Sequence, residues 1–223
     1  RITKNGGVDV WLRDLAGGGE RQLTFDGASY TPQWSPDGTS LAFIGPGRNP
    51  PPKLRSMSVA RARTESVVGE SPTANFAASW SGDGDSIVSV RLNSATRHDL
   101  WVQRVKDNTS ERLPFNTASN ESDGKVSPDG RWIAYVTDGS GKNEVWVASF
   151  PSGVVKAQVS AGGGESPQWA SGGSELLYLS GDTNPAAPAD RSVMAVTFKG
   201  QFDNIVPGSL RTLFAIRDLA ETD

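Results

Sequence analysis

The chain contains one histidine, His98, and any nucleophilic catalytic site would depend on it. A serine hydrolase needs a histidine base beside its serine, and that serine commonly lies in a Gly-x-Ser-x-Gly turn, which this sequence lacks. One histidine and no cysteine also exclude the usual zinc sites. We therefore expect no catalytic residue and no metal site in this chain.

Glycine-rich segments offer no convincing phosphate or dinucleotide site. Residues 139–142 read Gly-Ser-Gly-Lys, but the upstream glycine of a phosphate loop is missing and Asn143 stands where Ser or Thr should bind Mg²⁺. Residues 17–19 and 162–164 lack the dinucleotide spacing and precede strands rather than helices. We interpret all three as loops, and we expect no cofactor.

The overall composition excludes two further classes of function. The 223 residues carry a net charge of −3 without basic clusters, which argues against nucleic acid as a partner. No window approaches 18 consecutive apolar residues, so we expect no membrane insertion within this segment. With 25 Gly, 14 Pro and 7 Trp, the chain has the profile of short strands broken by frequent turns.

A six-residue motif recurs along the chain and predicts a tight turn. Its copies occupy residues 33–38, 79–84, 125–130 and 168–173, and the second residue of each copy is Trp34, Trp80, Val126 and Trp169, at intervals of 46, 46 and 43 residues. The Ser-Pro-Asp-Gly core supplies turn chemistry, because Pro presets φ and Gly accepts a positive φ at the exit. Gly82 replaces Pro in the second copy, and Gly172 replaces Asp in the fourth.

A second marker keeps the same period. Strand-like segments with an acidic residue two places before Trp surround Trp11, Trp101 and Trp146, and we expect Met57 and Met194 to occupy the equivalent places. The intervals are then 46, 44, 45 and 48 residues. Two markers in phase establish a repeat of about 45 residues.

Each repeat is predicted to hold four short strands. For the second unit these lie at about residues 30–34, 40–45, 54–60 and 65–69. A four-stranded antiparallel sheet repeated every 40–50 residues is a β-propeller blade, so the predicted fold is all-β. We expect the first and second strands to be the most buried, and the recurrent Trp to fill the space between blades while its N–H finds a partner.

These motifs resemble a known family. Trp-Ser-Pro-Asp-Gly, followed by an apolar strand, a Gly/Asn-rich loop and Glu-Val-Trp-Val, is similar to the repeats of TolB and its relatives, and residues 129–136 with 143–147 are the closest copy. The segment through residue 169 also resembles propellers appended to bacterial serine/threonine kinases. The TolB resemblance implies a WD-type propeller of bacterial, periplasmic or otherwise extracytoplasmic location, which binds a protein and does no chemistry.

The number of strands predicts an incomplete ring. We expect a single propeller segment over residues 1–223, with blade boundaries near 25, 70, 116 and 160. Residues 8–24 supply only the third and fourth strands of a blade, and four full repeats follow. The expected structure is an open arc of about four and a half blades from a ring of six or more, and the chain's ends are not expected to be the protein's ends.

The loops between second and third strands differ most among repeats, at residues 45–53, 93–98, 138–143 and 181–191. Binding residues concentrate on variable loops held by a rigid scaffold, so this rim is the predicted binding face for a protein partner or small ligand. The candidate residues are Arg48, Arg97, His98, Asp138, Lys142 and Arg191. The alternative reading is that these are solvated loop charges, and the motif aspartates are interpreted as turn residues.

Three functions remain open at this stage. The first is a non-catalytic interaction propeller of the TolB kind. The second is the sensor end of a bacterial receptor kinase, and the third is the gating propeller of an S9-type serine peptidase. A kinase and membrane span upstream, or a Gly-x-Ser-x-Gly segment downstream, would distinguish them.

Overall fold

The computed structural model describes residues 6–46, 51–60, 65–68, 73, 75–181, 191–199 and 205–216, and its regular elements are strands. They form a two-stranded first sheet and four four-stranded antiparallel sheets, numbered here in chain order. The first two sheets comprise β1 (Trp11–Arg13) and β2 (Glu20–Gln22), then β3 (Tyr30–Trp34), β4 (Ser40–Gly45), β5 (Lys53–Ser58) and β6 (Glu65–Val67). The third comprises β7 (Asn75–Trp80), β8 (Ser86–Asn93), β9 (Arg97–Arg104) and β10 (Ser110–Arg112). The fourth comprises β11 (Glu121–Val126), β12 (Trp132–Thr137), β13 (Glu144–Ser149) and β14 (Lys156–Gln158), and the fifth β15 (Gly164–Trp169), β16 (Glu175–Ser180), β17 (Ser192–Lys199) and β18 (Val206–Ala215).

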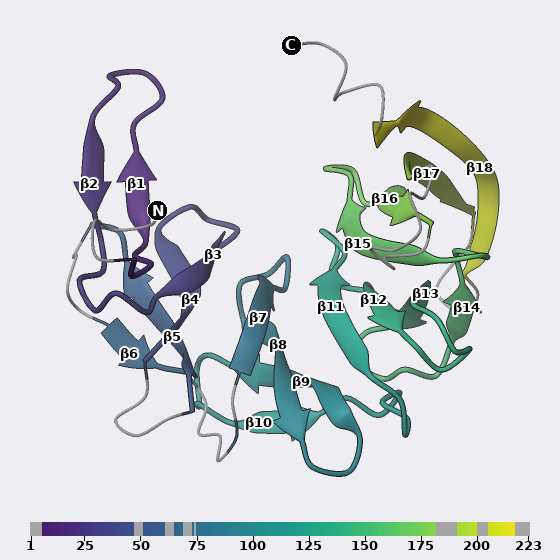
Figure 1. Cartoon of the computed structure of the whole chain (residues 1–223), viewed down its shortest axis with the longest axis horizontal. Helices are drawn as coiled ribbons and strands as arrows, with labels where there is room; N and C mark the ends of the chain where they lie inside the picture. The colour runs from purple at the N-terminus through teal and green to yellow at the C-terminus, as the bar shows by residue number, and fades with distance from the viewer. Residues whose placement is uncertain are drawn as a thin grey trace.

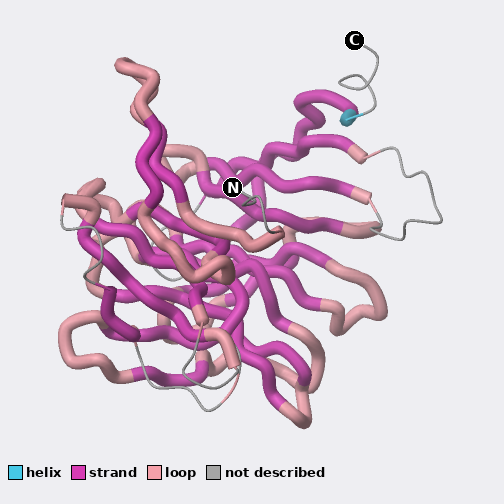
Figure 2. The backbone as a smooth tube through the Cα atoms, turned by 60° about the vertical axis from the view of Figure 1, so that its left-hand side comes forward, coloured by secondary structure: helices cyan, strands magenta, loops and turns pink. Residues whose placement is uncertain are grey.

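The sheets stand side by side around an open arc, with β3, β7, β11 and β15 on its inner side (Figure 1). Each complete sheet is a meander in which sequential strands pair, so turns and loops gather at the strand ends (Figure 2). We call the end with the motif turns the turn rim and the opposite end the loop rim. The predicted all-β architecture of four and a half propeller blades in an incomplete ring is confirmed. Among the described residues, no helix is long and apolar enough to cross a membrane.

The second sheet shows how closely the local pattern defines the strands. Strands predicted at 30–34, 40–45, 54–60 and 65–69 are observed as β3 to β6 with ends shifted by at most two residues. The turn between β3 and β4 closes as Gly38 N donates to Ser35 O at 2.9 Å, and Gly38 has φ 69°. Glycine meets this demand at the exit of the turn because it has no Cβ to clash.

The prediction that Met57 corresponds to the recurrent Trp is wrong. Trp101 pairs with Ser89 in β8, whereas the residue that pairs with the equivalent position of β4, Phe43, is Arg55. Phe43 and Ser89 both lie nine residues after their motif tryptophans, so they are equivalent. Sequence spacing misses this because the intervening loops differ in length, whereas cross-strand pairing defines the register.

The core lies between the sheets rather than around the inner strands. β4 is buried from Leu41 onward, whereas four of the five residues of β3 are exposed. The expectation that first and second strands are most buried therefore fails for β3, because it lines the open inner side of the arc. The largest clusters join the third sheet to the fourth and the fourth to the fifth.

Candidate functional site

A depression of about 290 Å³ opens on the turn rim, where the inner strands end. All four complete sheets contribute to its wall, and the shared contribution is the second residue of each motif. The lining includes Trp34, Trp80, Val126 and Trp169, together with Gln33, Pro36, Lys125, Pro128 and Gln168. We call this depression the axial mouth, because β3, β7, β11 and β15 surround the inside of the arc (Figure 1).

Two of the motif tryptophans join neighbouring sheets around the mouth. Trp80 Nε1 donates to Gln33 O at 3.2 Å, and Trp169 Nε1 donates to Lys125 O at 2.9 Å. In both cases the acceptor is the residue before the motif position of the preceding sheet. The expectation that the Trp packs between blades with its N–H satisfied is met at both positions, whereas Trp34 is 49% exposed.

The motif turns touch one another around the mouth. A Cβ built on Gly82 would lie 2.1 Å from Pro128 O, and one on Gly173 would lie 3.3 Å from Pro128 Cδ. The replacement of Pro by Gly82 in the second motif thus has a structural reason, since any side chain there would meet the backbone of the next turn. Close turn-to-turn contact fixes the outline of the mouth.

The motif aspartates hold the turns, as expected. Asp83 Oδ1 accepts from Ser81 Oγ at 2.5 Å and from Asp85 N at 2.9 Å. These two bonds, the serine's first, lower the pKa of Asp83 below its ordinary value. Asp37 makes the same bonds with Ser35 and Thr39, and its pKa is lowered for the same reason. The aspartates are therefore engaged locally in turn structure.

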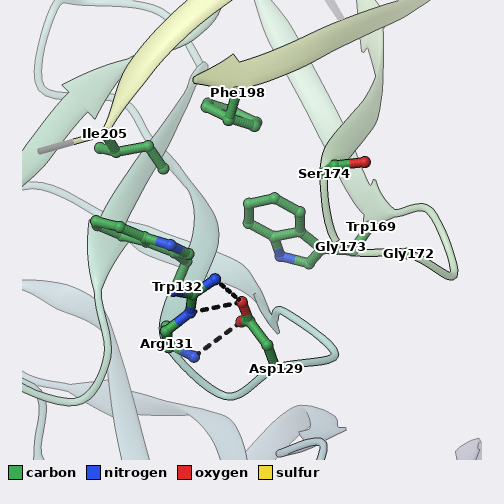
Figure 3. A pocket seen from close by; sticks show the side chains of 9 residues that line it. All are labelled: Asp129, Arg131, Trp132, Trp169, Gly172, Gly173, Ser174, Phe198 and Ile205. Atoms are coloured by element: carbon green, nitrogen blue, oxygen red, sulfur yellow. Dashed lines mark hydrogen bonds and ion pairs between the residues drawn. The ribbon is translucent and has the colours of Figure 1, made fainter. Parts of the chain in front are cut away.

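A second depression, of about 190 Å³, lies on the same rim between the fourth and fifth sheets (Figure 3). Its aromatic wall consists of Trp132, Trp169 and Phe198, with ring centroids of the latter two 5.5 Å apart. Arg131 Nη2 lies 2.6 Å from Asp129 Oδ2 at its edge. This arrangement of rings beside a neutralised ion pair can bind a flat or apolar group.

The predicted loop-rim residues do not form one cluster in the described part of the chain. Arg97 is exposed with φ 72°, and the ring of the neighbouring His98 packs edge-on against Phe76 with centroids 5.4 Å apart. Asp138 accepts from Asn120 N at 2.9 Å. That carboxylate thus joins the connection before β11 to the loop after β12.

The remaining candidates on this rim have different surroundings. Lys142 is exposed, and Arg191 forms an ion pair of 3.1 Å with Glu165, which also accepts from Asn143 Nδ2. Arg48 lies outside the described residues. Among the described candidates, no side-chain hydrogen bond or ion pair joins one to another, and the binding of a partner at this rim stays a prediction.

Sequence reasoning missed the axial mouth, although the signal was available. The sequence pattern assigns Trp34, Trp80 and Trp169 to packing alone, yet they end the innermost strands, whose tips must meet where the sheets converge. A motif position repeated in every blade is a ring of residues in three dimensions. Across the described residues, no three His, Asp or Glu side chains are grouped to hold a metal ion.

Together the fold and the mouth define an open β-propeller with a concave surface on its axis. A family profile described as TolB beta propeller domain matches residues 29–204, and the chain belongs to this family. A protein TolB homolog of Chlorobium luteolum is 28% identical over 154 residues, which are 68% of this chain and 34% of that protein. The chain therefore spans about a third of the length of this curated relative.

Solved structures share the fold. TolB from Acinetobacter baumannii aligns with a TM-score of 0.72 and 14% identity, covering 92% of this chain and 48% of that one. A TolB-like protein from Agrobacterium tumefaciens aligns with 0.74 and 20%, covering 92% and 73%. A prolyl endopeptidase structure also aligns, with 0.61 and 16%, covering 96% of this chain and 34% of that one.

Proposed function

We propose that this chain is a binding propeller that recognises a protein partner at the axial mouth and performs no chemistry itself. The observation that carries the proposal is the convergence of one motif position from each complete sheet on a single depression. Concave sites where rigid elements converge are the usual places for recognition.

The lining favours recognition of a polypeptide. Half-exposed Trp34 offers an aromatic face, and the exposed Gln33 and Gln168 offer amides that both donate and accept hydrogen bonds. Lys125 is the charged side chain in the lining, and its Nζ lies 3.5 Å from Asp123. Indole, proline and amide groups bind peptide backbone well, and none is a typical proton-transfer group at neutral pH.

Two finer parts of this function rest on the family relationship. We infer an extracytoplasmic, periplasmic location from the similarity to TolB proteins, and we infer that further chain completes the propeller, because the curated relative is about three times as long as the matched span. The loop rim with Arg97, His98, Asp138, Lys142 and Arg191 is proposed as a second binding face.

Site-directed photocross-linking in the source cells tests the proposed mouth. A photoreactive residue at Gln33 or Gln168 is expected to capture one protein reproducibly. The same residue at Leu15 is expected not to, because Leu15 is 93% exposed in the turn between β1 and β2, and that hairpin lies at one end of the arc, outside the inner strands (Figure 1). Trp34→Ala should reduce the capture about tenfold or more, since aromatic anchors at binding sites contribute most of the affinity.

The captured protein also tests the absence of chemistry. Its mass after incubation with the purified chain is expected to equal its mass before. Equal capture from Leu15 and Gln33, or capture unaffected by Trp34→Ala, would contradict the mouth as the binding site. A changed mass would contradict a purely binding role.

A second candidate is a gating propeller attached to a peptidase. The fold likeness to a third of a prolyl endopeptidase chain favours it. Sequencing the gene on both sides of this segment distinguishes the two, because a peptidase would carry a Gly-x-Ser-x-Gly segment in a separate hydrolase domain.

A further inference from the structure

Arg91 is a buried arginine in the interface between the second and third sheets. It lies on β8, two residues before the loop rim, on the face shared with Ile87, which packs against Ala42 and Ile44 of the second sheet. Arg91 is only 4% exposed. It thus carries a cation into the packed interface between these two sheets.

The guanidinium of Arg91 lies against an aromatic ring, and within the described part of the chain no ion pair involves it. Its Cζ lies 4.4 Å from the centroid of the Trp101 ring, which is a cation–π arrangement. Burial lowers the pKa of Arg91 to about 10, so the group remains charged at neutral pH. A buried charge is costly unless a counter-ion and hydrogen bonds accompany it.

The nearest acid along the sheet is already engaged. Asp99 is the cross-strand neighbour of Arg91, but its two oxygens accept from Arg112 Nε and Nη2 at 2.9 Å each. Asn93 Nδ2 and Thr96 Oγ1 donate to the same carboxylate. Asp99 therefore pairs with Arg112, and among the described residues no carboxylate pairs with Arg91.

Two nitrogen atoms of the Arg91 guanidinium, Nε and Nη2, form a pair of hydrogen-bond donors. Its Nε and Nη2 are buried, and no acceptor lies within hydrogen-bonding distance of either in the chain as described. These are the same two donors with which Arg112 holds both oxygens of Asp99. Such a parallel pair matches the geometry of one carboxylate.

We propose that Arg91 binds the carboxylate of a ligand that enters the seam between the second and third sheets from the loop rim. Trp101 supports the guanidinium from one side, and the Nε and Nη2 hydrogen bonds hold the two ligand oxygens. The site lies at the opposite end of β8 from the axial mouth. Carboxylate binding at Arg91 can therefore be tested independently of partner binding at the mouth.

The test uses the purified chain and acetate as the simplest carboxylate. Sodium acetate replaces sodium chloride at constant ionic strength while the ¹H,¹⁵N signals of arginine Nε–H groups are recorded, and Arg91→Met identifies the Arg91 signal. We expect this signal to shift downfield and saturate. At acetate about tenfold above Kd, the unfolding midpoint should rise by about 3 °C in the wild type and not in Arg91→Met.

One control tests whether the response is a general salt effect, and a second ligand tests which kind of molecule supplies the carboxylate. Arg104→Met removes the same charge from an exposed arginine of β9 and should keep the acetate response. If a peptide terminus is the natural ligand, acetyl-diglycine with a free terminal carboxylate should shift the Arg91 signal at lower concentration than acetate. The same peptide with a terminal amide in place of the carboxylate should not shift the signal. A stronger response to acetate would instead indicate a small carboxylate.

An Arg91 signal that responds equally to acetate and chloride would overturn the proposal, as would equal stabilisation of the wild type and Arg91→Met. If Arg91→Met does not fold, the Nε–H titration of the wild type decides alone, with Arg91→Lys identifying the signal.

Discussion

Single residues in this chain are fixed by contacts between turns as well as within them. Gly82 is the clearest case, because a Cβ at this position would lie 2.1 Å from Pro128 O, the carbonyl of the next motif. A backbone oxygen cannot move away as a flexible side chain can. The residue type at position 82 is therefore set by the neighbouring blade.

Gly82→Ala is expected to destabilise the chain by about 1–3 kcal/mol, the usual cost of forcing atoms into a packed site. Urea unfolding measures this. Gly172→Ala is the matched control, since the nearest atom to its added Cβ is Ser174 Oγ at 3.9 Å, and it should change stability by under about 0.5 kcal/mol. Equal effects of both substitutions would contradict the turn contact.

The motif aspartates predict an acid-sensitive fold. Bonds from Ser81 Oγ and Asp85 N lower the pKa of Asp83, so its contribution to stability is present above the pKa of an unfolded Asp, about 3.9, and is lost as pH falls through the lower folded value. Unfolding free energy should fall below about pH 4. Asp83→Asn keeps an acceptor for Ser81 but cannot titrate, so its profile should be flatter in this range, and an unchanged slope would be evidence against the assignment.

At the scale of the element, the fifth sheet lacks the hydrogen bond between the motif serine and the motif aspartate that the other three motif turns make. Its turn closes with the same backbone bonds, Ala170 N to Glu175 O at 2.9 Å and Gly173 N to Ala170 O at 2.8 Å. Yet Ala170 stands where the other motifs have Ser, and Gly172 stands where they have Asp. The donor and its acceptor are therefore absent together, although the turn itself remains.

Restoring this pair should stabilise the fifth sheet. Ala170→Ser with Gly172→Asp is expected to gain about 1 kcal/mol from the new side-chain hydrogen bond, while each single substitution gains little. A double-mutant cycle in urea measures the coupling. Additive single effects would show that the serine and aspartate do not act together.

Buried acids anchor the third strands at the loop rim. Glu144 begins β13 and accepts from Gly162 N and Gly163 N at 3.0 Å each, as well as from Ser160 Oγ, so it ties the connection before β15 to the fourth sheet. Glu144→Ala is expected to cost about 2–4 kcal/mol, because it leaves these buried donors unpaired. Glu144→Gln keeps one acceptor and should cost less. Hydrogen exchange at Gly162 and Gly163 should rise in the alanine variant, and unchanged exchange would argue against the anchor.

Local patterns predicted the elements well and the register less well. The turn chemistry of the motifs fixed the boundaries of β3 and β4, because Ser, Asp and Gly act within five residues. The equivalence of Arg55 with Trp101 could not be found by spacing, because pairing across strands is not local. The axial mouth escaped prediction for the same reason: convergence of the four inner strands depends on the packing of whole sheets.

At the scale of the molecule, stability comes from the interfaces between sheets. Each sheet is thin, and its apolar residues meet those of its neighbour, as Val88 and Leu100 of the third sheet meet Ile133 of the fourth. The arc in Figure 1 therefore has two end faces as well as its inner and outer strands. In a repeat architecture such ends are the places where further subunits or repeats add.

The outer edge of the fifth sheet predicts self-association. β18 is ten residues long, whereas β6, β10 and β14 have three each, and β18 pairs only with β17 among the described strands. Its Leu210 is 52% exposed and its Leu213 38%. A long edge strand with exposed apolar side chains is a template for pairing with another chain.

We expect the isolated chain to associate as its concentration rises from about 10 to about 200 µM, the range in which exposed strand edges become aggregation-prone. Leu210→Lys with Leu213→Lys should keep it monomeric, because charges on an edge strand oppose pairing. Sedimentation velocity measures the difference, and Val154→Lys is the control, since Val154 is 82% exposed in the turn between β13 and β14. A wild type that stays monomeric throughout would show that the edge is protected in the folded chain. A double variant that associates like the wild type would place the contact elsewhere, on the inner strands or the first sheet.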